Sequence, residues 1–169
     1  MEFKDFLRGT VLLTASAATA LAAISAVGIN STGDDKLAAL VLGWWVIAIV
    51  VGIWLGRPSR AVAALAGPLA AARTATQLPS ESPARIAFGR LWPIFLFVII
   101  TGALGPFVPQ VPAIATGFAL GVAGAWRSRE PAVTAVEDRD GVVFYVENGS
   151  AFEPIKLIRS PGLRRGSAA

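Results

Sequence analysis

The run from Leu37 to Gly56, LAALVLGWWVIAIVVGIWLG, constrains the fold of this chain more than any other segment. It carries no charged residue, and a helix of this length rises about 30 Å, which matches the hydrocarbon core of a bilayer. The whole chain of 169 residues is 54% hydrophobic and only 15% charged, too few polar side chains to cover a soluble domain of this size. The sequence therefore predicts an integral membrane protein.

Three further apolar runs give the expected number of transmembrane helices. We expect spans at about 10–29, 37–56, 91–107 and 109–127, within a transmembrane domain that covers 10–130. The predicted fold class is an all-α membrane protein with four transmembrane helices, up-down-up-down, and a small C-terminal cytoplasmic β-meander.

The first run has an alternative interpretation as a secretory signal peptide. Ala15-Ser16-Ala17 has the small residues of a cleavage site after an apolar stretch. We expect the run to be retained, because Glu2 and Asp5 offset Lys4 and Arg8 and leave a poor positive n-region.

The distribution of Lys and Arg predicts the orientation. Before residue 131, the basic residues fall on one side of the predicted membrane, in the N-terminal segment 1–9, in the connection 57–90 and just after the fourth span. The other side has only Lys36. We expect a multi-pass protein of the cell membrane with both termini in the cytoplasm. Trp54, Trp92 and Trp126 lie near the basic ends of their spans, as in an aromatic belt.

The composition changes after the fourth span. Three short β-prone runs, 132–137, 142–147 and 155–159, are separated by Asp140-Gly141 and Asn148-Gly149, which are typical of hairpin turns. We expect a cytoplasmic β-hairpin or meander over 131–160 and a mobile basic tail over 161–169. So small a sheet buries little core by itself, so we expect it to pack on the basic loop 57–90, the membrane surface or another chain.

Two groups of residues are candidate interaction sites. Small residues let transmembrane helices approach closely, and the predicted helix–helix interface comprises Gly52, Gly56, Gly117 and Gly121. These glycines serve either packing inside the bundle or a groove for another subunit. The residues predicted to contact anionic lipid headgroups are Arg57, Arg60, Arg73, Arg85 and Arg90, although the same arginines also set the topology.

Candidate chemistry is sparse. The chain has no Cys and no His, and no ionisable residue lies inside the four apolar runs, which argues against proton-coupled transport and intramembrane hydrolysis. We predict no catalytic residue, no cofactor, no metal site and no nucleic-acid partner. Hydroxyls such as Thr14, Ser25 and Thr101 fit either a polar pore or bonds to their own helix, and we favour the second. Pro93, early in the third span, is expected to leave its helix undisturbed.

These observations predict a non-enzymatic membrane scaffold or accessory subunit of a larger assembly. Its expected partners are the bilayer, anionic headgroups, and another membrane protein or a second copy of itself. The alternative is a small oligomeric permease or channel for a neutral or lipid-like solute.

Overall fold

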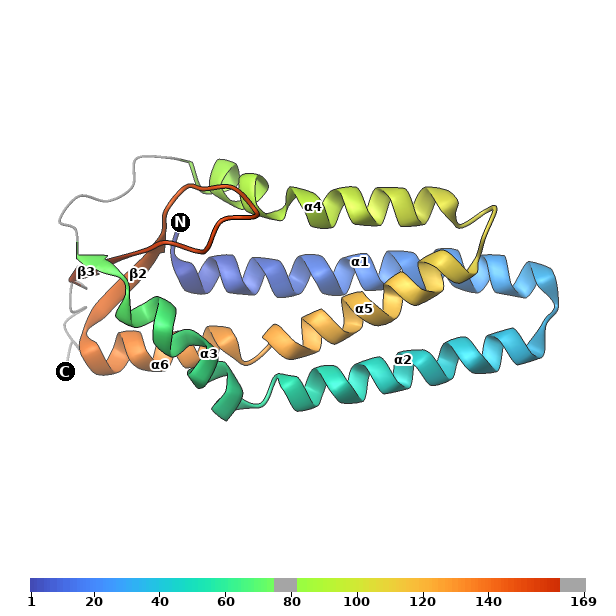
Figure 1. The fold of residues 1–169 in the computed structure, drawn as a ribbon, viewed down its shortest axis with the longest axis horizontal. Helices are drawn as coiled ribbons and strands as arrows, with labels where there is room; N and C mark the ends of the chain where they lie inside the picture. The colour runs from blue at the N-terminus through green and yellow to red at the C-terminus, as the bar shows by residue number, and fades with distance from the viewer. Residues whose placement is uncertain (75–81, 162–169) are drawn as a thin grey trace, which may run out of the picture.

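The computed structural model describes residues 1–74 and 82–161, and long helices run along its whole length (Figure 1). The helices are α1 (Phe3–Thr32), α2 (Asp35–Leu55), α3 (Pro58–Ala70), α4 (Pro83–Leu104), α5 (Gln110–Trp126) and α6 (Arg129–Asp140). The strands are β1 (Arg73–Thr74), β2 (Val142–Val146) and β3 (Leu157–Pro161). Within the described residues, α1, α2 and α4 are long and apolar enough to cross a membrane. Helix α5 is shorter, with 17 residues.

The turn between α1 and α2 follows from its local sequence. Helix α1 ends at Gly33, whose φ of 64° is left-handed and suits a residue without a Cβ. The Asp34 carboxylate then accepts hydrogen bonds from the Lys36 and Leu37 backbone N–H groups and so caps α2. Two long helices therefore reverse direction across a very short connection.

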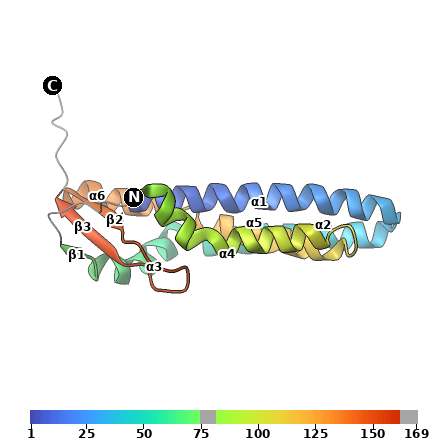
Figure 2. The same ribbon diagram turned by 90° about the horizontal axis from the view of Figure 1, so that it is seen from above.

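Helix α5 occupies the centre of the helical layer. It slants between α1 and α2 and packs closely along both of them, whereas α4 lies beside α1 and makes fewer contacts with its neighbours (Figures 1 and 2). The chain direction alternates from α1 to α2, then from α4 to α5 (Figure 1). The central helix thus holds the others together, and α4 is the most loosely packed.

Helix α4 begins earlier than the sequence suggests. It starts at Pro83, so Pro93 lies in the helix interior, and the ribbon bends in this region (Figure 2). Proline has no N–H to donate to the carbonyl four residues before it, and its ring clashes with that carbonyl. The expectation that Pro93 leaves the helix undisturbed was wrong, because it assumed that the helix starts near residue 91.

A compact region at one end, which we call the cap, joins the start of α1, α3, the start of α4, α6 and the three strands (Figure 1). Its core draws on residues far apart in the sequence, among them Phe6, Leu65, Ile86, Val133 and Phe144. The segment 131–160 was expected to pack on the basic loop 57–90, on the membrane surface or on another chain. The first of these is confirmed, since Leu65 and Ile86 of that loop share its core. The N-terminal turn also contributes: the Val146 N–H donates to the Met1 carbonyl at 3.0 Å.

The sheet differs from the predicted meander. Its order is β1-β3-β2, with β2 antiparallel to β3 and β1 parallel to β3. Strands at 142–146 and 157–161 fit the prediction, and in β2 the side chains of Val142, Phe144 and Val146 are buried, as the alternation indicated. The third strand is β1, which comes from the basic loop.

The run 132–137 forms helix α6, not the predicted first strand. Gly141 has a φ of 62° and ends this helix in the left-handed conformation, so Asp140-Gly141 is a helix end and not a hairpin turn. The apolar residues Ala132, Val133 and Val136 are spaced to lie on one helical face, which packs into the cap core. Helical packing therefore overrides the β-propensity of this segment.

Candidate functional site

The predicted helix–helix glycines lie where α2 packs against α5. A Cβ built on Gly52 would lie 2.7 Å from the Gly121 carbonyl oxygen and 3.0 Å from the Gly121 Cα. Gly56 faces Gly124, and Gly117 faces the Trp44 indole. The four predicted glycines are thus taken up by packing within the chain. Gly124, which the sequence analysis missed, is part of the same contact.

Two tryptophans add hydrogen bonds to this helix contact. Trp44 Nε1 donates to the Ile114 carbonyl at 3.2 Å, and Trp45 Nε1 donates to the Ala113 carbonyl at 2.9 Å. Each indole N–H thus has a backbone carbonyl acceptor on the neighbouring helix. Helices α2 and α5 are therefore joined by side-chain hydrogen bonds as well as by close backbone packing.

Hydroxyl groups along the helices bond to their own backbone. Each donates to the carbonyl four residues earlier, at 2.7–3.1 Å, in the case of Thr10, Thr14, Thr19, Ser25, Thr101 and Thr116. A hydroxyl used in this way has its proton occupied and adds little polarity to a pore. Of the two interpretations offered by the sequence, these hydroxyls therefore fit the favoured one, in which they bond to their own helix.

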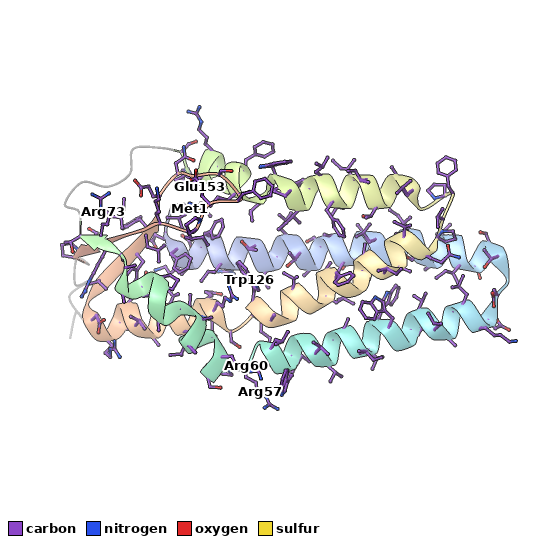
Figure 3. The ribbon with its side chains drawn as sticks, viewed as in Figure 1. Met1, Arg57, Arg60, Arg73, Trp126 and Glu153 are labelled. Carbon is purple, nitrogen blue, oxygen red and sulfur yellow. The ribbon has the colours of Figure 1, made fainter. Side chains whose placement is uncertain are left out.

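The five predicted lipid-contact arginines are not gathered into one patch. Arg57 and Arg60 lie together at the corner between α2 and α3, whereas Arg73 lies on β1 at the far end of the cap (Figure 3). The Arg60 guanidinium stacks over the Trp54 ring at 3.6 Å from the ring centroid. Arg85 is exposed in the first turn of α4. Arg57, Arg60 and Arg85 thus flank the junction between the helical layer and the cap.

Arg90 is placed differently from the other four. Its side chain is only 7% exposed, and its guanidinium donates to the Glu153 carbonyl at 3.4 Å and to the Glu147 carbonyl at 3.2 Å. A buried guanidinium that bonds two backbone carbonyls is directed into the protein. Arg90 therefore anchors the connection between β2 and β3, and its guanidinium is not available to a lipid headgroup.

Glu137 is a buried carboxyl that the sequence did not single out as such. Its Oε1 accepts the Phe144 N–H at 2.9 Å, and its Oε2 lies 3.7 Å from Lys4 Nζ. Burial raises the pKa of Glu137, against the opposing effects of the Phe144 hydrogen bond and the Lys4 charge. This contact joins α6, β2 and the start of α1, so Glu137 has a structural role in the cap.

The acidic side chains between residues 137 and 153 do not converge on one point. Glu137 bonds within the cap core, and Asp140 pairs with Arg139 at 2.8 Å. In residues 1–74 and 82–161, no three Asp or Glu side chains come close enough to hold a metal ion.

An apolar hollow opens on the side of the helical layer. This lateral groove, of about 240 Å³, is formed by α1, α4 and α5. Its lining consists of Thr14, Ala17, Pro93, Ile94, Phe97, Val98, Phe118, Ala119 and Val122. Thr14 contributes the hydroxyl of the lining, and that hydroxyl already donates to the Thr10 carbonyl. The groove can therefore hold an apolar surface but has little to offer a polar solute.

A second hollow lies in the cap. It has a volume of about 330 Å³ and lies between α3 and α6, with Leu65, Leu69 and Val136 among its lining residues. Arg139 and Arg159 also line it, and Arg139 is already paired with Asp140. This cleft combines an apolar floor with a charged edge, and no contact in the structure indicates its occupant.

Comparison with family models, curated proteins and solved structures found no match to this chain.

Proposed function

We propose that this protein is a non-enzymatic integral membrane protein that serves as a scaffold or accessory subunit of a larger membrane assembly. The lateral groove is the observation that carries the proposal. It is apolar, open at the side of the helical layer and bounded by the loosely packed helix α4. Such a groove suits an apolar helix of another membrane protein, because close van der Waals packing drives helix association in lipid.

The proposed topology has four spans, α1, α2, α4 and α5, with both termini in the cytoplasm of a cell-membrane protein. Helix α5 rises about 26 Å and reaches a full crossing with the turn residues that precede it. All the elements of the cap lie at one end of the molecule, and the α1–α2 turn lies at the other (Figure 1). Most basic residues of the described chain belong to the cap or to the helix ends next to it, whereas Lys36 lies in the first turn of α2. The positive-inside rule supports a cytoplasmic cap.

Anionic lipid headgroups are a proposed secondary partner. Arg57, Arg60 and Arg85 are exposed near the boundary between the spans and the cap, and Trp54 is 46% exposed beside Arg60. Arginines at this level attract an anionic leaflet by about 1 kcal/mol each. We expect this attraction to hold the cap against the membrane surface without selecting one lipid.

The permease alternative has weaker support. A conducting path for a polar solute needs free polar groups, and the helix hydroxyls named above donate to their own backbone. No ionisable side chain lies inside the four apolar runs to bind or couple an ion.

The test is purification from native membranes in a gentle detergent, followed by mass spectrometry of the proteins that copurify. We expect a second membrane protein in stoichiometric amount with the wild-type chain. The groove variant Val122→Trp should lose it, because the larger side chain fills the hollow. The matched variant Leu42→Trp should keep it, because Leu42 is also exposed but lies on α2, which does not line the groove.

The proposal fails if the wild-type protein purifies alone and turns over or transports a substrate by itself. Loss of the partner from both variants alike would also contradict the role of the groove.

A further inference from the structure

The connection between β2 and β3 folds back against α4. This β2–β3 loop, residues 147–156, lies beside the first part of α4 and not in the open beyond the sheet (Figures 1 and 2). Glu153, labelled in Figure 3, sits next to that helix. The loop therefore has a fixed position relative to one of the proposed spans.

Arg90 holds the loop in this position. Its guanidinium bonds the carbonyls of Glu147 and Glu153, one at each side of the loop tip. The backbone is close as well: a Cβ at Gly149 would lie 2.7 Å from Arg90 Nη2. Because the buried Arg90 guanidinium bonds a carbonyl on each side of the loop tip, it fixes the position of the tip along α4.

The loop tip presents an aromatic side chain at the membrane boundary. Phe152 is 80% exposed, and its ring meets Trp92 edge-to-face with the ring centroids 6.1 Å apart. Trp92 is one of a row of exposed aromatics on α4, with Phe88 at 66% and Phe95 at 42% exposure. These residues follow helical spacing, so the row runs along one face of α4 from its start into the span.

The position of Trp92 sets the depth of Phe152. Trp92 is at the start of the proposed third span, where tryptophan prefers the layer between headgroups and hydrocarbon. Phe152 touches Trp92 and so lies at the same level. Its large exposed apolar surface, which would be unfavourable in water, lies where lipid is available.

We propose that the β2–β3 loop is a membrane-docking loop, with Phe152 inserted in the interfacial layer of the cytoplasmic leaflet beside Trp92. The proposal rests on the proposed assignment of α4 as a span. The loop carries Glu147 and Glu153 against Lys156, so charge does not draw it to an anionic membrane. Insertion depends on the exposed apolar surface at position 152 and not on charge, so a bilayer of zwitterionic lipid is a sufficient partner.

The experiment uses depth-dependent fluorescence quenching on the full chain, which has no cysteine of its own. Single variants Phe152→Cys, Asp138→Cys and Ile99→Cys carry an environment-sensitive fluorophore and are reconstituted in phosphatidylcholine vesicles with lipids spin-labelled at shallow or deep positions. Asp138 is exposed on α6 and serves as the aqueous control. Ile99 is 66% exposed on α4 and serves as the control within the span.

We expect the shallow spin label to quench the fluorophore on Phe152→Cys several-fold more than that on Asp138→Cys, with no anionic lipid present. Adding Arg90→Lys should reduce this quenching, because a lysine cannot bond both carbonyls in the same fork. Quenching on Phe152→Cys no greater than on Asp138→Cys, with Ile99→Cys quenched by the deep label, would overturn the docking loop and leave α4 as a span. If Ile99→Cys is not quenched either, both the loop and the proposed membrane assignment are overturned.

Discussion

Replacing Gly52 by alanine should loosen the contact between α2 and α5. The new Cβ would lie 2.7 Å from the Gly121 carbonyl oxygen, about 0.7 Å inside the 3.4 Å at which ordinary contact begins. The opposing atoms are backbone and cannot rotate away, so the two helices must separate. Overpacking of this kind costs about 1–3 kcal/mol. Separation would also weaken the hydrogen bond from Trp45 to the Ala113 carbonyl.

Gly43→Ala provides the matched control for this substitution. Gly43 lies on the same helix, and a Cβ there would meet nothing within 4 Å. The assay is thermal unfolding in a mild detergent, followed by circular dichroism, with the intrinsic tryptophan fluorescence as a second probe. We expect a lower Tm for Gly52→Ala and an unchanged or slightly higher Tm for Gly43→Ala. Equal Tm values for the two variants would refute the argument that close backbone approach holds α2 to α5.

Three further perturbations test other contacts of the fold. Burial raises the pKa of Glu137, so the folded state favours the protonated carboxyl. The contribution of Glu137 to folding stability is therefore present below about pH 4.5 and is lost as the pH rises through the higher pKa of the folded state. In Glu137→Gln the amide still accepts the Phe144 N–H but does not titrate. The Tm of this variant minus the Tm of the wild type should therefore increase as the pH rises above 4.5. A difference that stays constant with pH would contradict this. Trp45→Phe removes the hydrogen bond to the Ala113 carbonyl and should lower the stability in detergent by about 0.6–2 kcal/mol, unlike a change at an exposed position such as Val46→Ala. Arg90→Met frees the β2–β3 loop, so trypsin should cut after Lys156 faster than in the wild type, whereas Arg85→Met, an exposed change on the same helix, should leave the rate unchanged.

The parts of the fold that depend on local pattern could be predicted from the sequence. The uncharged runs indicate α1, α2 and α4, because their length and hydropathy are properties of a single segment. The alternation of Val142, Phe144 and Val146 likewise indicates β2 and its buried face. In each case one stretch of chain contains the whole pattern.

The parts that depend on distant partners could not be predicted in this way. Strand β1 has two residues, and only its pairing with β3 makes it a strand. The run 132–137 has β-prone residues, yet it packs as a helix because its apolar face meets the cap core. Tertiary packing, which a single segment does not reveal, decided both outcomes.

The candidate sites show the same division. The glycines at 52 and 121 could be expected at a helix contact from their spacing, but the sequence does not say which helix each one meets. From the sequence alone, Arg90 cannot be distinguished from the other arginines of the basic loop. Its burial depends on carbonyls at 147 and 153, which lie far along the chain. The sequence thus predicts the kinds of residue at these sites more readily than their partners.

Cysteine accessibility in intact cells tests the central claim, a four-span protein with its cap in the cytoplasm, most directly. Single variants Ser31→Cys, Ser82→Cys and Ser150→Cys place a thiol at the α1–α2 turn, before α4, and in the β2–β3 loop, each at an exposed position. A membrane-impermeant maleimide should label Ser31→Cys in intact cells and should label the other two only after permeabilisation. Labelling of Ser82→Cys and Ser150→Cys from opposite sides would show that α4 and α5 do not both cross. Labelling of these two but not Ser31→Cys in intact cells would show that the orientation is reversed.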